Sequence, residues 1–179
     1  MNKLTSNITI LFLIYFNSTF TFAQENKLQL NSTSLSIGLI GVPSDTSSIG
    51  VDIGLNIGLD LSAKLSENIF SFYLNGGSQL HFFDARESYT EINVTYGREI
   101  KLNSWIILEG HLGVGYFNYS FKNGLTDFQT VTQSTIGFPL RVKLIFYTEK
   151  NFGIGINPNM NWNSLVKTYS GNLIFQYKF

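Results

Sequence analysis

The two histidines of this 179-residue chain, His81 and His111, are its clearest candidates for acid-base chemistry. His111 follows Glu109 by two residues, so on an extended strand the carboxylate and the imidazole share one face. A carboxylate that orients an imidazole is half of a hydrolase site, which also needs a nucleophile within hydrogen-bond reach. No local pattern supplies that nucleophile. We therefore expect both histidines to be packed side chains with satisfied nitrogens.

The charged side chains are the second candidate set, because they occupy the polar positions of alternating segments. Burying such charges without partners is costly, so we expect the carboxylates to meet Arg141 and Lys143 in a hydrogen-bonded network. Glu99 and Lys178 also occupy inward positions of the pattern. The predicted network consists of Asp52, Asp60, Glu91, Glu109, His111, Arg141 and Lys143.

Neither a metal nor another cofactor is expected. The chain has no cysteine, and two histidines without a thiolate make a poor metal site. Asp52, Asn56 and Asp60 repeat every four residues on one face, which places neighbours about 13 Å apart at the rise of a strand. These three groups are too far apart to share one calcium ion.

The elements that carry these residues alternate with a period of two, which is typical of β-strands. In residues 49–62 every odd position is aliphatic, and every even position is glycine, carboxylate, amide or hydroxyl. Seven further segments alternate in the same way, namely residues 34–39, 70–82, 91–97, 106–116, 135–144, 152–162 and 169–179. Eight strands with short connections predict an all-β, antiparallel, up-and-down barrel, and the longest expected loop spans residues 118–130.

Alternation does not tell which face points outward, since a soluble barrel reverses the arrangement of a membrane barrel. Charged residues make up 13% of the chain, against about 25% in an ordinary soluble domain, and aromatics make up 15%. The apolar face also carries aromatics at the strand ends, where membrane girdles lie. These are Phe70, Tyr96, Phe146, Phe152, Tyr177 and Phe179 at one rim, and Phe82, Tyr116, Trp162 and Tyr169 at the other. We therefore predict a transmembrane β-barrel with its polar face inside.

Two further features bear on the chain's organisation. Residues 1–23 combine Lys3, a short apolar run and a small-x-small ending at Ala23, which predicts a signal peptide followed by a barrel domain over residues 24–179. Pro139 lies inside the 135–144 pattern and has no amide hydrogen for the ladder, so a bulge or kink is expected there.

The last strand resembles the C-terminal insertion signal of bacterial outer-membrane proteins. Leu173, Phe175, Tyr177 and Phe179 alternate and end in a terminal phenylalanine. The run 137–143 also resembles a G-[aliphatic]-P-L strand of porin-like barrels. The mature chain is thus similar to the small outer-membrane β-barrel superfamily of Gram-negative bacteria, the OmpA-transmembrane, OmpX and porin-like group. The resemblance implies export, delivery to the barrel-assembly machinery, and surroundings of outer-membrane lipid and lipopolysaccharide.

For function, an eight-stranded barrel is just wide enough for side chains to fill, which favours a plugged lumen. We expect a non-enzymatic structural or surface-interaction protein. The alternatives are a porin-like channel for small solutes and, less favoured, a lipid A-modifying enzyme of this barrel class. The formal net charge of zero gives no support to a nucleic-acid partner, and no loop motif specifies a surface ligand.

Overall fold

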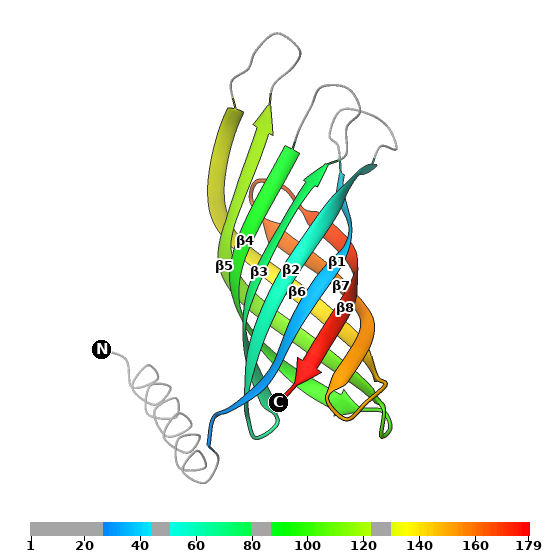
Figure 1. The fold of residues 1–179 in the computed structure, drawn as a ribbon. Coiled ribbons are helices and arrows are strands. Elements are labelled where there is room, and N and C mark those ends of the chain that lie inside the picture. Colours follow the sequence, from blue (N-terminus) through cyan, green and yellow to red (C-terminus); the bar gives the residue numbers. More distant parts are fainter. Residues whose placement is uncertain (1–26, 44–50, 80–86, 123–129) are drawn as a thin grey trace, which may run out of the picture.

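The computed structural model describes residues 27–43, 51–79, 87–122 and 130–179, which form one closed antiparallel barrel (Figure 1). Each strand pairs with the next along the chain, and β1 pairs with β8 to close the cylinder. The strands are β1 (Gln29–Pro43), β2 (Val51–Leu65), β3 (Asn68–Gln79), β4 (Glu87–Lys101), β5 (Ile106–Lys122), β6 (Thr130–Tyr147), β7 (Phe152–Asn163) and β8 (Thr168–Lys178). The predicted eight-stranded up-and-down barrel is confirmed. No helix within these ranges is long and apolar enough to cross a membrane.

The apolar face of the strands points outward and the polar face inward. On β2, for example, Leu59 is 54% exposed, whereas its neighbour Asp60 is 5% exposed. The same alternation runs along β4 and β7, where exposed and buried residues follow one another. The barrel therefore has a polar interior inside an apolar wall, which is the reverse of a soluble barrel.

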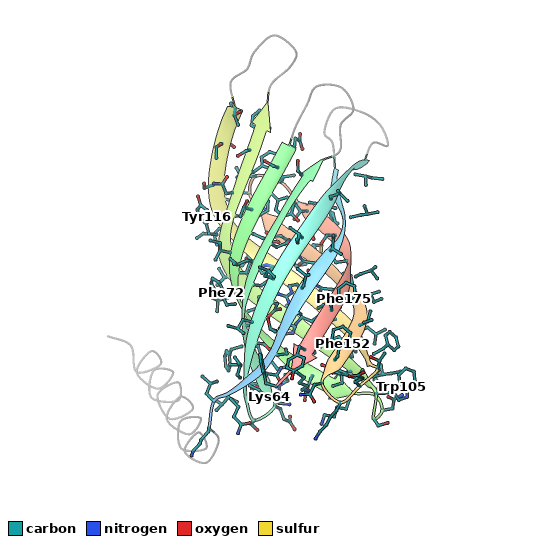
Figure 2. All side chains as sticks on the ribbon, in the orientation of Figure 1. Lys64, Phe72, Trp105, Tyr116, Phe152 and Phe175 are labelled. Carbon is teal, nitrogen blue, oxygen red and sulfur yellow. The ribbon has the colours of Figure 1, made fainter. Side chains whose placement is uncertain are left out.

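Aromatic side chains lie at both ends of the outer wall (Figure 2). The C-terminal end, where the chain terminates, carries Phe152 and Trp105, whose ring lies 5.8 Å from that of Phe146. Toward the opposite end, which we call the distal end, lies Tyr116. Phe82, predicted for the same rim, is outside the described residues. The aromatic residues at the two ends thus bracket an apolar belt, which is mainly aliphatic but also contains Phe72 and Phe175.

Strands β5 and β6 are longer than the others and project beyond the distal end of their neighbours (Figure 1). Their pairing continues to Lys122 and Thr130, whereas β6 pairs with β7 only from Gly137 onward. The expectation of a loop over residues 118–130 was therefore wrong for residues 118–122 and for Thr130. The misleading signal was the change of face, because Phe117 is buried and Tyr119 packs against the same cluster, whereas the hydroxyl of Ser120 bonds that of Thr132 at an exposed position.

Of the bulge or kink expected at Pro139, the bulge is wrong. The β5–β6 register is the same on both sides of the proline, with Leu112 opposite Leu140 and Gly115 opposite Gly137, but the pairs between them are missing. The missing amide hydrogen is thus accommodated by a short interruption of the ladder rather than by an inserted residue. In the described pairings of β1, a register shift occurs instead between Leu30 and Ser32.

Candidate functional site: the polar lumen

A chain of ion pairs crosses the lumen from β2 to β6 and on to β5. Asp60 accepts a hydrogen bond from Arg141, and its Oδ2 lies 3.1 Å from Nζ of Lys143. The same ammonium lies 3.3 Å from Oε2 of Glu109, and Gln176 of β8 donates to the other oxygen of that carboxylate at 3.0 Å. Every one of these side chains is at most 5% exposed. With His111, which also contacts Glu109, the structure thus brings together five of the residues predicted for the network.

An aromatic ring completes the plug at the level of Arg141. The guanidinium carbon of Arg141 lies 3.7 Å from the ring centroid of Tyr73, which is 1% exposed. Gly58 makes room for that ring, because a Cβ on Gly58 would lie 2.8 Å from the Tyr73 hydroxyl and 2.9 Å from its Cε2. A cation stacked on an aromatic face gains electrostatic attraction in a desolvated setting, so this pair both fills and stabilises the lumen.

Glu91 belongs to a separate, amide-rich cluster. Its carboxylate accepts hydrogen bonds from Asn75 at 2.5 Å and from Asn161. The hydroxyl of Tyr89 joins the cluster through Asn75 at 3.1 Å and through Asn56. The expectation that Glu91 would meet Arg141 or Lys143 was therefore wrong, because asparagines from β3 and β7 reach its carboxylate.

His111 lies in a chain of polar groups that resembles a hydrolase triad in its order. Its Nε2 lies 3.2 Å from Glu109, and its Nδ1 lies 3.5 Å from the hydroxyl of Thr95, which is 2.7 Å from that of Ser71. Sequence reasoning missed both hydroxyls, because they come from β4 and β3 and only the register of the sheet places them beside the imidazole. Thr95 and His111 are each 1% exposed, so a substrate does not reach the hydroxyl from lipid or water.

A second charged cluster lies near the C-terminal end of the lumen. Glu99 forms ion pairs with Lys64 of β2 and, at 2.9 Å, with Lys178 of β8. Both lysines are about a quarter exposed, so these pairs are screened by solvent in a way that the Asp60 cluster is not. The sequence placed Glu99 and Lys178 inside the barrel but gave no reason to join them to Lys64.

The remaining predicted positions divide into those that the structure describes and those that it does not. Leu173, Phe175 and Tyr177 lie exposed on β8, opposite Ile37, Leu35 and Thr33 of β1. The amide of Phe179 donates to the carbonyl of Asn31 at 3.0 Å, which extends this closing seam. Their role as an insertion signal stays a prediction. Residues 1–26, His81 and the side chain of Asp52 lie outside the described part of the chain.

The donor groups of the lumen do not assemble into a recognisable metal centre. Over the described ranges, no three histidine, aspartate or glutamate side chains gather closely enough to hold an ion. The lumen carboxylates instead accept hydrogen bonds from the arginine, lysine, glutamine and asparagine side chains described above. Chemically, the site is a set of buried charged and amide groups that pair with one another, although Oδ1 of Asp60 and Nε and Nη1 of Arg141 have no hydrogen-bond partner among the described residues.

Comparison with known proteins finds solved structures with a similar fold. No family model and no curated protein matches the sequence. The barrel is similar to the crystal structure of Neisserial surface protein A, with a TM-score of 0.69, 11% identity, and coverage of 83% of this chain and 97% of that one. It is also similar to Ail, the attachment invasion locus protein of Yersinia pestis, with a TM-score of 0.56, 20% identity, and coverage of 83% and 99%. A third similar structure is the outer membrane protein OprG from Pseudomonas aeruginosa, with a TM-score of 0.54, 12% identity, and coverage of 84% and 97%. The chain therefore has the closed eight-stranded barrel fold of small bacterial outer-membrane proteins.

Proposed function

We propose that this chain is a non-enzymatic integral protein of the bacterial outer membrane, in which a sealed barrel anchors the projecting β5–β6 pair outside the cell. The apolar belt and its aromatic rims support insertion into lipid. The fold shared with Neisserial surface protein A, Ail and OprG supports the outer membrane as the site of insertion. Export by residues 1–23, insertion through the Phe179 signal, and contact with lipopolysaccharide belong to the same proposal.

The observation that carries this proposal is the closure of the lumen. Arg141, Lys143, Glu91, Glu109 and Gln176 are each 0% exposed, and they come from β4, β5, β6 and β8. A solute that crossed the barrel would have to break the Asp60–Arg141 pair and displace the ring of Tyr73. The structure therefore favours an anchor over the porin-like alternative, and the burial of His111 disfavours a lipid-modifying enzyme.

Conductance is the measurement that separates the anchor from the channel. Purified protein reconstituted into planar bilayers is expected to give no defined single-channel steps, because the lumen is filled by side chains. The comparison is the Tyr73→Ala, Arg141→Ala double variant, which removes the two largest groups at one level of the plug and is expected to conduct. Reproducible steps of one size in the unsubstituted protein would show that it is a channel.

The orientation is tested by cysteine labelling, since the chain contains no native cysteine. Thr132→Cys lies on the projecting part of β6, and Ser104→Cys lies in the turn between β4 and β5 at the C-terminal end. In intact cells, a membrane-impermeant maleimide is expected to label Thr132→Cys and to label Ser104→Cys only after permeabilisation. The opposite pattern would invert the proposed topology, and labelling of both variants in a soluble fraction would contradict insertion altogether.

A further inference from the structure

A recess with a volume of about 580 Å³ lies in the mouth of the barrel at its C-terminal end. It is lined by the β4–β5 turn, the β6–β7 turn and the end of β8, and we call it the basin. Its floor includes Ile107, which is 7% exposed, and Tyr147, whose hydroxyl accepts a hydrogen bond from the buried Gln176 at 3.0 Å. The basin is therefore open to water above and ends at the lumen network below.

The two turns that form the walls of the basin are held in place by hydrogen bonds. The side-chain oxygen of Asn103 accepts a bond from the amide of Trp105 at 2.9 Å, which fixes the first turn. The amide of Tyr147 donates to the carbonyl of Trp105 at 2.8 Å, and the amide of Lys178 donates to that of Asn151 at 2.8 Å. A ligand would thus meet walls that are already ordered, which lowers the entropic cost of binding.

Positive charge predominates in the basin. Three of its lining side chains are lysine and one is glutamate, which leaves an excess of two positive charges. Lys178 pairs with Glu99 at 2.9 Å, but Lys64 shares that carboxylate, so this pairing does not reduce the excess. Lys101 and Lys150 form no ion pair with any residue in the part of the chain that the structure describes. Two exposed ammonium groups from different turns therefore remain available to an anion.

Two hydroxyl groups add further hydrogen-bond donors. Ser104 lies in the first turn and Thr148 in the second, and neither hydroxyl has a partner within the described residues. Donors on two walls suit an anion that carries oxygens on several sides, as a tetrahedral phosphate does. A planar carboxylate is matched best by the fork of an arginine, and no arginine is among the described residues that line the basin.

We infer that the basin binds a phosphate monoester group, held by the ammonium groups of Lys101 and Lys150 and by the hydroxyls of Ser104 and Thr148. Such a group carries close to two negative charges at neutral pH, which matches the excess charge of the basin. The inference goes beyond the proposed function, because it concerns the opposite end of the barrel from the projecting β5–β6 pair. It also does not depend on which side of the membrane the C-terminal end faces.

Two sources of this group have access to the basin. A soluble phosphate monoester reaches it from the water above. A lipid headgroup reaches it from the side, because Leu102 and Trp105 of the same turn are 57% and 51% exposed and suit the membrane interface. The recognised chemistry is the same in both cases, so the experiment has one arm for each source.

NMR of the full barrel in nanodiscs tests the inference through the backbone amides of residues 101–104 and 148–150. In the first arm, the nanodiscs contain phosphatidylcholine alone, and glycerol 3-phosphate is added. In the second arm, no soluble ligand is added, and phosphatidic acid replaces increasing amounts of the phosphatidylcholine. Saturable shifts concentrated in these two turns are expected in at least one arm, and that arm identifies the source of the phosphate.

A pair of variants with matched charge provides the control. Lys101→Ala with Lys150→Ala removes two cations from the basin, whereas Lys122→Ala with Lys167→Ala removes two from the distal half of the chain's strands β5 and β8. The first pair is expected to weaken binding by at least about tenfold, because hydrogen bonds to charged groups are the strong ones. The second pair is expected to change it by less than about twofold, since distant exposed charges are screened.

Three outcomes would overturn the inference. Shifts that rise without saturation in both arms would show that phosphate only accumulates near a positive surface. An equal loss of binding in the two variant pairs would show that overall charge, and not the basin, attracts the anion. Saturable binding of succinate at the same concentrations as glycerol 3-phosphate would show that the basin does not select phosphate from carboxylate.

Discussion

Replacing Asp60 by alanine is expected to lower the free energy of unfolding by about 3–5 kcal/mol, because the substitution leaves a buried arginine without its anion. Asp60 is the carboxylate shared by Arg141 and Lys143. Lys143 keeps Glu109 as a partner at 3.3 Å, whereas the described ion pair of Arg141 is the one with Asp60. Arg141 is 0% exposed, so water does not replace the lost carboxylate without entering the lumen.

Urea unfolding of the barrel in phospholipid vesicles measures this loss through the fluorescence of Trp105 and Trp162, the two tryptophans of the chain. The matched control is Lys64→Ala, which breaks a partly exposed pair with Glu99 and is expected to cost no more than about 1 kcal/mol. Adding Arg141→Met to Asp60→Ala removes the unpaired charge and is expected to recover part of the stability. Equal losses for Asp60→Ala and Lys64→Ala would show that the lumen is hydrated.

The strand pattern was predictable because the period of two is a local property of the sequence. In residues 53–62 the polarity of each side chain predicts the face on which it lies, and the structure places these side chains accordingly, with Leu59 outside and Asp60 inside. The same rule failed where the environment changes. Above the apolar belt, β5 continues with Phe117 buried inside and Asn118 outside, so a rule that equates apolar with outward ended the strand too early.

The side-chain partners within the lumen were not predictable, because they depend on the register of the strands and on which strands lie opposite each other across the barrel. Asp60 and Arg141 are 81 residues apart and meet across the barrel. Glu91 looked equivalent to Asp60 in the sequence, since both are acidic residues at inward positions. Asparagines surround Glu91, whereas cations surround Asp60. These neighbours come from other strands, and the spacing of residues in the sequence does not show which of them lie at the same height in the barrel.

The outer wall gives the second large effect: Val94→Arg is expected to cost about 2–4 kcal/mol, the penalty for a cation near the bilayer midplane. Val94 is 60% exposed on β4, opposite Phe72 of β3 and Val114 of β5. On the same strand, Tyr96 lies nearer the C-terminal end, and Ile92, opposite Tyr116, lies nearer the distal end. Val94 therefore occupies the middle of the apolar belt.

Asn118→Arg is the matched control, since it places the same cation on the outer face of β5 but above the belt. At that height the cost is expected to be no more than about 1 kcal/mol, as it is near the interfaces of a membrane. Both variants are compared with the unsubstituted protein by urea unfolding in vesicles, and by the mobility shift of the folded barrel on unboiled gels. A soluble barrel would tolerate arginine equally at both heights, because exposed positions of a water-facing wall accept charge. A clear cost at Val94 together with little cost at Asn118 therefore tests lipid contact directly, which alternation alone does not do.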